Sequence, residues 1–151
     1  MKWSGISVIM VLMLWLPRVD AQVYVHSDSA YRIAKASGKP ILLVFSGTDW
    51  CPGCMRFDKK VLRDSLFAQE GAKLVVVLRA DFPQRSKLPV ELVKQNDSLA
   101  AIYNSTGLFP HIVLLHANDS KQQRTISYTT ESAREFITLL KSLLPTIGYH
   151  D

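Results

Sequence analysis

The sequence predicts an α/β domain in which a central mixed sheet of four to five strands is flanked by helices on both faces. The predicted segments run helix, strand, helix, strand, helix, strand, strand, helix, an order that favours this layered architecture. Two strand segments, 41–45 and 73–78, are short and almost wholly apolar, as in strands buried on both faces. The 151 residues suffice for one domain with a substantial core.

The start of the chain has the pattern of a secretory signal peptide. Lys2 supplies a positive charge, residues 6–16 are an apolar stretch of 11 residues, and residues 19–21 fit a signal-peptidase site. We expect cleavage after Ala21, which assigns 1–21 to a cleaved signal peptide and 22–151 to a single domain.

A membrane anchor is the alternative interpretation of this segment. It is disfavoured because Pro17 and Arg18 end the apolar stretch well short of the roughly 20 residues that a spanning helix needs. A cleaved signal predicts a periplasmic or secreted protein, in a compartment where thiol pairs become oxidised unless a partner keeps them reduced. The C-terminal residues 148–151 are no ER-retention signal, which favours a bacterial periplasm.

The elements are predicted from apolar spacing together with capping and turn residues. In chain order we expect an extended start at 23–26, a helix at 29–37, a strand at 41–45, a helix at 55–62, a short helical turn to Gln69, a strand at 73–78, a helix from Pro89 to Asn104, antiparallel strands at 111–116 and 124–128, and a last helix ending at Pro145. Ser27 or Asp28 is expected to cap the first helix, and Thr129 or Thr130 the last. Gly38, Gly71 and Gly107 are expected to end helical segments.

The charge of the chain is mild. Beyond residue 21, 16 basic and 12 acidic side chains remain, a net charge of +4. No basic stripe with interleaved aromatic residues is present, so no nucleic-acid partner is expected.

The segment Trp50-Cys51-Pro52-Gly53-Cys54 contains the only two cysteines of the chain. It lies between a predicted strand and a predicted helix, with Cys51 at or just before the helix start and Cys54 one turn further on. Unpaired backbone N–H groups and the helix dipole favour an anion at this position, and the thiolate is the nucleophilic form of cysteine. The sequence therefore predicts a redox pair in which Cys51 is the more exposed and more acidic thiol and Cys54 resolves mixed disulfides.

Three other interpretations of the pair are open. A structural disulfide closing so short a loop would stabilise the fold by only roughly 2 kcal/mol. A zinc site needs about four ligands, whereas His111 and His116 are five apart in a predicted strand and so lie on opposite faces. The cysteines can also be two inert buried thiols.

Trp-Cys-Pro-Gly-Cys after a core strand, with Phe109-Pro110 before a later strand, resembles the thioredoxin superfamily over about residues 30–144. The resemblance implies a thioredoxin fold. The local pattern is most similar to exported bacterial thioredoxin-like (thiol:disulfide interchange) proteins, on the segments 39–41, 49–51, 80–83, 95–96 and 101–103.

The resemblance also implies a role for each site residue. Cys51 matches the attacking cysteine and Cys54 the resolving one, while Pro52 and Gly53 between them match the dipeptide that helps tune the reduction potential. Trp50 matches the aromatic residue that flanks the disulfide, although ordinary packing also explains it. Around the strand entry, Pro110 matches the cis-proline facing the disulfide, and its neighbours Phe109 and His111 are expected to present backbone groups to an extended substrate.

Two positions depart from the pattern of the superfamily. Phe45 lies six residues before Cys51, where thioredoxins have a buried Asp that helps move the proton of the resolving thiol. We expect Phe45 in the core beneath the active-site helix and slow resolution near neutral pH. His111 stands where Thr is common, and it is either a hydrogen-bonded structural residue or a group near Cys51 that stabilises the thiolate.

The sequence thus predicts an exported thiol–disulfide oxidoreductase that reduces or isomerises protein disulfides. The alternatives are a disulfide oxidase, or a non-enzymatic thioredoxin-fold module that binds peptides. The expected partners are protein or peptide disulfides and, as electron donor, a membrane-bound thiol reductase. We expect a monomer without bound cofactor or metal.

Overall fold

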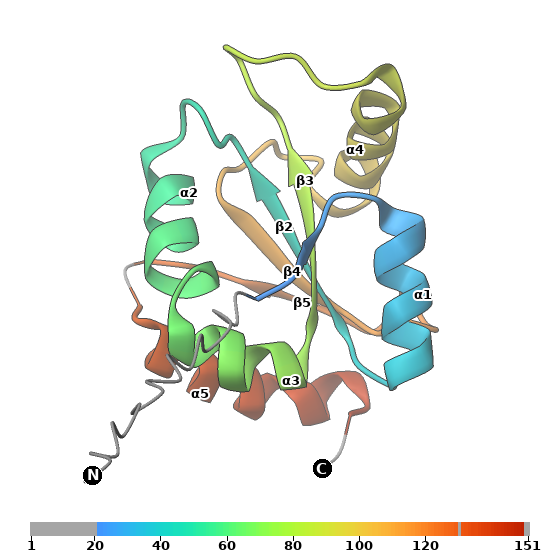
Figure 1. Cartoon of the computed structure of the whole chain (residues 1–151). Coiled ribbons are helices and arrows are strands. Elements are labelled where there is room, and N and C mark those ends of the chain that lie inside the picture. The colour runs from blue at the N-terminus through green and yellow to red at the C-terminus, as the bar shows by residue number, and fades with distance from the viewer. Residues whose placement is uncertain (1–20, 130, 150–151) are drawn as a thin grey trace, which may run out of the picture.

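The computed structural model describes residues 21–129 and 131–149, in which five strands form one mixed sheet (Figure 1). The spatial order is β1-β3-β2-β4-β5. The strands are β1 (Val23–Tyr24), β2 (Ile41–Ser46), β3 (Val76–Asp81), β4 (His111–Leu115) and β5 (Gln123–Ile126). β1, β3 and β2 are parallel, whereas β4 and β5 join as antiparallel strands. The predicted sheet and the antiparallel pairing of its last two strands are confirmed.

Helices cover both faces of this sheet, as predicted (Figure 1). On one face lie α1 (Ser27–Ser37) and α4 (Val90–Tyr103). On the other lie α2 (Pro52–Phe57), α3 (Ala72–Leu74) and α5 (Ala133–Leu143), with the π-helical turns η1 (Asp58–Leu62) and η2 (Phe67–Gly71) and the 3₁₀ turn η3 (Leu144–Ile147). No helix among the described residues is both long and apolar enough to cross a membrane. The predicted signal peptide lies outside the described residues except for Ala21.

Strand β2 is the centre of the fold, and all six of its residues are buried. Because side chains alternate along a strand, Leu42 and Val44 pack with Phe57 of α2 on one face. Leu43 and Phe45 pack on the opposite face, in the layer covered by α1 and α4. The cysteine segment 50–54 therefore follows the central, fully buried strand of the sheet.

The boundaries around β3 differ from the prediction. The strand begins at Val76 instead of residue 73, since Lys73 and Leu74 belong to α3. Its register is set by pairing with β2, from Ile41 opposite Val76 onwards. Gly71 is the last residue of η2, as predicted, but it does not stop the helical run, since α3 follows directly at Ala72. A Cβ on Gly71 would come 2.4 Å from the Phe67 ring.

The caps of two helices were also predicted wrongly. Helix α1 begins at Ser27, whose backbone N–H donates to Oε1 of Gln95 on α4, so a residue distant in sequence satisfies it. Helix α5 is capped by Ser132 in a capping box with Glu135, not by Thr129; Thr130 lies outside the described residues. Gly38 ends α1 in the left-handed conformation, as predicted.

Candidate active site

Cys51 and Cys54 form a disulfide at the start of α2. Cys51 is the N-cap residue, and its Sγ accepts a hydrogen bond from the backbone N–H of Cys54 at 3.2 Å. Pro52 follows as the first helical residue, where its missing N–H is of no consequence. The predicted place of both cysteines is confirmed. Their exposures are nearly equal, 4% and 3%, so the structure does not reproduce the predicted difference in exposure.

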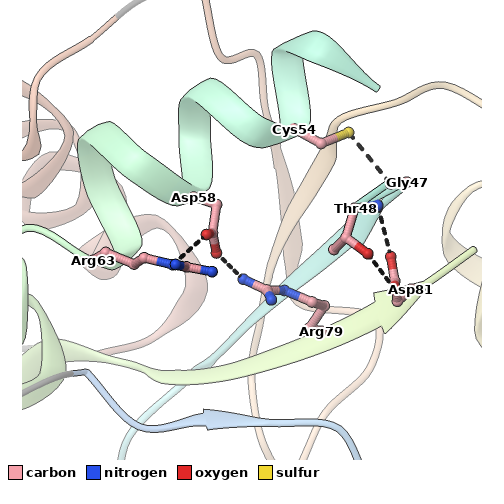
Figure 2. Close-up of polar contacts among 7 residues, drawn as sticks. All are labelled: Gly47, Thr48, Cys54, Asp58, Arg63, Arg79 and Asp81. Carbon is pink, nitrogen blue, oxygen red and sulfur yellow. Dashed lines mark hydrogen bonds and ion pairs between the residues drawn. The ribbon is translucent and has the colours of Figure 1, made fainter. Parts of the chain in front are cut away.

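The sulfur of Cys54 lies against the turn that follows β2. The backbone N–H of Gly47 donates to Cys54 Sγ at 3.4 Å (Figure 2). Gly47 is also required by packing, because a Cβ at this position would lie 2.3 Å from the Trp50 ring. Both sulfurs of the pair therefore accept a backbone N–H.

The peptide bond between Phe109 and Pro110 is cis, as expected. The Pro110 ring faces the cysteine segment, since a Cβ on Gly53 would lie 3.0 Å from Pro110 Cδ. Pro110 precedes β4, which pairs with β2. The sheet thus brings the predicted proline and the predicted cysteine segment together across about 60 residues of sequence.

Aromatic side chains surround the cysteine segment. The Trp50 ring packs edge-on against Phe109 with centroids 5.3 Å apart, and Phe109 packs against Phe82 at 5.5 Å. Trp50 Nε1 donates to the backbone carbonyl of Phe82 at 2.7 Å. Leu108, which precedes Phe109 in the chain, is 59% exposed.

Asp49 fastens the loop after β3 to the cysteine segment. Its carboxylate accepts hydrogen bonds from the backbone N–H groups of Gln84, Arg85 and Ser86. These bonds, that of Gln84 above all, hold the pKa of the Asp49 carboxyl below its ordinary value. Ionised Asp49 therefore keeps this loop next to Trp50.

The structure corrects the predicted place of Phe45. The side chain is fully buried, but it lies on the α1 and α4 face and packs against Phe82 and His111. Strand alternation instead places Val44 on the face of α2, in register with Arg79 of β3. Neither side chain supplies a carboxylate near Cys54.

His111 has the contacts of a structural histidine. Its Nε2 lies 2.9 Å from the carbonyl oxygen of Tyr103 at the end of α4, and its ring contacts Phe45 at a centroid distance of 5.9 Å. Of the two predicted interpretations, these contacts favour the hydrogen-bonded structural residue.

A cleft of about 690 Å³ opens on the Cys54 side of the disulfide. Its polar lining consists of Thr48, Asp58, Lys59, Arg63, Arg79, Asp81 and Asn96. Of these, only Asp81 and Asn96 belong to the sequence segments that carry the resemblance. Two features of the sequence could have identified part of this lining. Asp58 is four residues after Cys54 and so lies on the same helical face, and Arg79 follows a run of apolar residues in a predicted strand. Among the described residues no group of three or more His, Cys, Asp or Glu is placed to hold a metal ion.

The model of the family described as thioredoxin-like matches residues 22–117. The chain belongs to the thioredoxin-like family. The match includes β1 to β4, both cysteines and the cis-proline, and the thioredoxin fold implied by the sequence is confirmed.

Individual relatives agree with this assignment. The chain is 32% identical over 111 residues to the disulfide bond reductase DsbH of Chlamydia pneumoniae, an alignment covering 74% of this chain and 66% of that protein. The chain therefore matches slightly less than two thirds of the length of this relative.

Solved structures give the same architecture. The structure of a DsbH oxidoreductase superposes with a TM-score of 0.74 at 26% identity, covering 94% of this chain and 95% of the other. A thioredoxin from Thermus thermophilus has a TM-score of 0.60 at 18% identity, with coverages of 85% and 91%; this likeness concerns the fold alone.

Proposed function

We propose that this protein is an exported thiol–disulfide oxidoreductase that reduces or isomerises protein disulfides through Cys51 and Cys54. The observation that carries the proposal is the disulfide at the start of α2, opposite a cis-proline. The similarity to a disulfide bond reductase supports the reducing direction.

Cys51 is the attacking residue in this proposal. In the reduced protein its sulfur would keep the Cys54 N–H as a donor, and a hydrogen bond to the charged form favours thiolate. A lowering of the thiol pKa from about 8.5 to about 7 raises the thiolate fraction at neutral pH from about 3% to half.

The reaction then takes two exchange steps. The Cys51 thiolate attacks a substrate disulfide, forms a mixed disulfide and releases the first substrate sulfur as thiolate. The Cys54 thiolate attacks Cys51 Sγ, forms the intramolecular disulfide and releases the second substrate sulfur. The substrate gains two electrons and the cysteine pair loses two. When a substrate thiol attacks the mixed disulfide instead, the result is isomerisation.

The surroundings of the disulfide suit an extended protein substrate. In this proposal the backbone groups next to the cis-proline lie beside the sulfurs, where a strand of substrate can pair. The exposed Leu108 and the Trp50 and Phe109 rings offer apolar contact to its side chains. The oxidised pair must be reduced again, and we propose a membrane-bound thiol reductase as the donor.

Reduction of insulin by dithiothreitol, with and without the protein, tests the activity. The parent protein should accelerate precipitation of the insulin chains, and Cys51→Ser should abolish the acceleration. If the parent protein did not accelerate precipitation, and both it and Cys51→Ser bound peptides, the site would be a peptide-binding module with incidental thiols. The reduction potential decides direction: about −270 mV suits a reductase, and about −120 mV an oxidase.

Export has a separate test. The predicted signal peptide supports a periplasmic or secreted location. Expression of the whole chain in a bacterium, followed by N-terminal sequencing of the periplasmic fraction, should give a protein that begins at Gln22. Retention of residues 1–21 in a membrane fraction would contradict cleavage.

A further inference from the structure

Two consecutive residues after β2 connect the resolving cysteine to β3. The N–H of Gly47 donates to Cys54 Sγ at 3.4 Å. The N–H of Thr48 donates to Asp81 Oδ1 at 3.0 Å, and the Thr48 hydroxyl donates to Asp81 Oδ2 at 2.7 Å. Figure 2 shows the Cys54 sulfur directed toward this turn, with the Asp81 carboxylate beneath Thr48. One carboxylate thus holds the residue next to the donor that contacts Cys54.

Asp81 is itself fixed in place. It is the last residue of β3 and lies in register with Ser46, the last residue of β2. Its backbone carbonyl accepts a hydrogen bond from the buried Asn96 side chain of α4 at 2.9 Å. The next residue, Phe82, donates its N–H to the Ser46 carbonyl at 2.8 Å. The turn is therefore anchored to the sheet on one side and to α4 on the other.

Three of the other charged groups that line the cleft, Asp58, Arg63 and Arg79, are ion-paired with one another. Asp58 forms ion pairs with Arg63 and Arg79, and Figure 2 shows its carboxylate directed at these two side chains. Lys59 also lines the cleft. The charged groups around Cys54 are thus Asp58, Lys59 and Arg63 from the helical segment and Arg79 and Asp81 from β3, while α4 contributes the neutral Asn96.

We propose that Thr48 and Asp81 are positioning residues for the resolving step, which hold the Gly47 N–H against Cys54 and so make its thiol ionise more readily. In the mixed disulfide, Cys54 loses its proton to water in the cleft. Its thiolate attacks Cys51 Sγ, a new disulfide bond forms, and the bond to the substrate sulfur breaks. The departing substrate thiolate takes up a proton from water. A thiolate is a stronger hydrogen-bond acceptor than a thiol, so a fixed donor favours ionisation.

This role rests on the proposed function, but its test does not. In a Cys51→Ala background Cys54 is the only thiol, and its ionisation is followed by thiolate absorbance against pH without any substrate. Thr48→Val removes the hydroxyl donor and leaves every charge in place. We expect the Cys54 pKa to rise by about 0.5 to 1 unit. Thr48→Ser keeps both donors, and its Cys54 should titrate within about 0.2 units of the background protein.

The Asp81→Asn variant distinguishes two possible effects of Asp81 on the Cys54 pKa: positioning through hydrogen bonds and a direct effect of its negative charge. If Asp81 acts by positioning, loss of its hydrogen bonds with Thr48 raises the Cys54 pKa, as in Thr48→Val. If its negative charge acts directly, its removal favours the thiolate and lowers the Cys54 pKa. The proposal is overturned if Asp81→Asn lowers the pKa, if Thr48→Val leaves it unchanged, or if Thr48→Ser shifts it as much as Thr48→Val.

The resolving rate provides a second readout in the protein that retains both cysteines. A rise of one pKa unit lowers the thiolate fraction of Cys54 at pH 7 roughly tenfold and so slows the release of substrate from Cys51. The difference should vanish at a pH above both values, where Cys54 is ionised in either variant. A slower rate that does not recover at high pH contradicts an effect on ionisation. If the parent protein did not reduce insulin but Cys54 titrated as predicted, the proposed function would be rejected. The positioning role of Thr48 and Asp81 would still hold.

Discussion

Replacement of Phe45 tests how the core supports the active site. Phe45 is fully buried and contacts the rings of Phe82 and His111 at centroid distances of 6.4 and 5.9 Å. Truncation of a buried phenylalanine to alanine costs about 3–5 kcal/mol through lost transfer free energy and the cavity left behind. A domain of this size has a free energy of unfolding of about 5–15 kcal/mol. We therefore expect Phe45→Ala to fold with a markedly reduced stability.

Urea denaturation followed by far-UV circular dichroism measures this effect. The midpoint should fall while the slope of free energy against urea stays constant. Phe45→Leu, which retains most of the volume, should lose less than about 1.5 kcal/mol. Ile102→Ala is the matched control, because Ile102 is 68% exposed and should change stability by less than about 0.5 kcal/mol. A loss below about 1 kcal/mol in Phe45→Ala would refute the packing described for this face.

A charged substitution at residue 45 tests which face of the sheet this side chain occupies. Phe45→Asp places a carboxylate in the apolar layer covered by α1 and α4, where burial of the charge destabilises the fold. Because this layer lies across the sheet from α2, the variant should not accelerate the resolving step. An accelerated step near neutral pH would mean that residue 45 does reach Cys54.

Three further predictions concern the residues around the disulfide. Gly47→Ala should force the Trp50 ring from its place, costing about 1–3 kcal/mol and shifting the emission of the only tryptophan beyond residue 21; unchanged emission would contradict it. Asp49→Ala should speed hydrogen exchange of the amides at 84–86. The pKa of Asp49 is lowered in the fold, so its stabilisation of this loop is present above the ordinary value of 3.8. That stabilisation is lost as pH falls through the folded-state pKa. A difference in exchange that stayed constant while the pH fell through the titration of Asp49 would argue against this. His111→Thr should leave the thiolate titration of Cys51 unchanged, since the imidazole is bonded to Tyr103; a shift above about 0.5 units would place the ring near the sulfur.

Local chemistry accounts for what the sequence could predict. An apolar run, a cysteine pair and a following helix identify β2, the N-cap cysteine and the redox pair without tertiary information. The cis-proline followed from the resemblance to a family, because an X–Pro bond is seldom cis by itself.

Tertiary contacts account for what the sequence could not predict. The start of β3 depends on its register with β2, and residues 73 and 74 suit a strand or a helix equally. The bonds from Thr48 to Asp81 join residues 33 positions apart, and no spacing rule links them. The face of Phe45 was misjudged because a count back from Cys51 ignores the strand alternation that places Val44 toward α2.

In the proposed mechanism Cys51 attacks substrates and Cys54 resolves the mixed disulfide. Its most direct measurement is the trapping of a disulfide-containing substrate by single-cysteine variants, read by non-reducing electrophoresis and mass spectrometry of the linked peptide. Cys54→Ala should accumulate a mixed disulfide through Cys51, and the adduct should disappear with dithiothreitol. Cys51→Ala should trap little, because Cys54 lacks the N-cap position that favours a thiolate. Efficient trapping by Cys51→Ala and none by Cys54→Ala would show that the roles of the two cysteines are reversed.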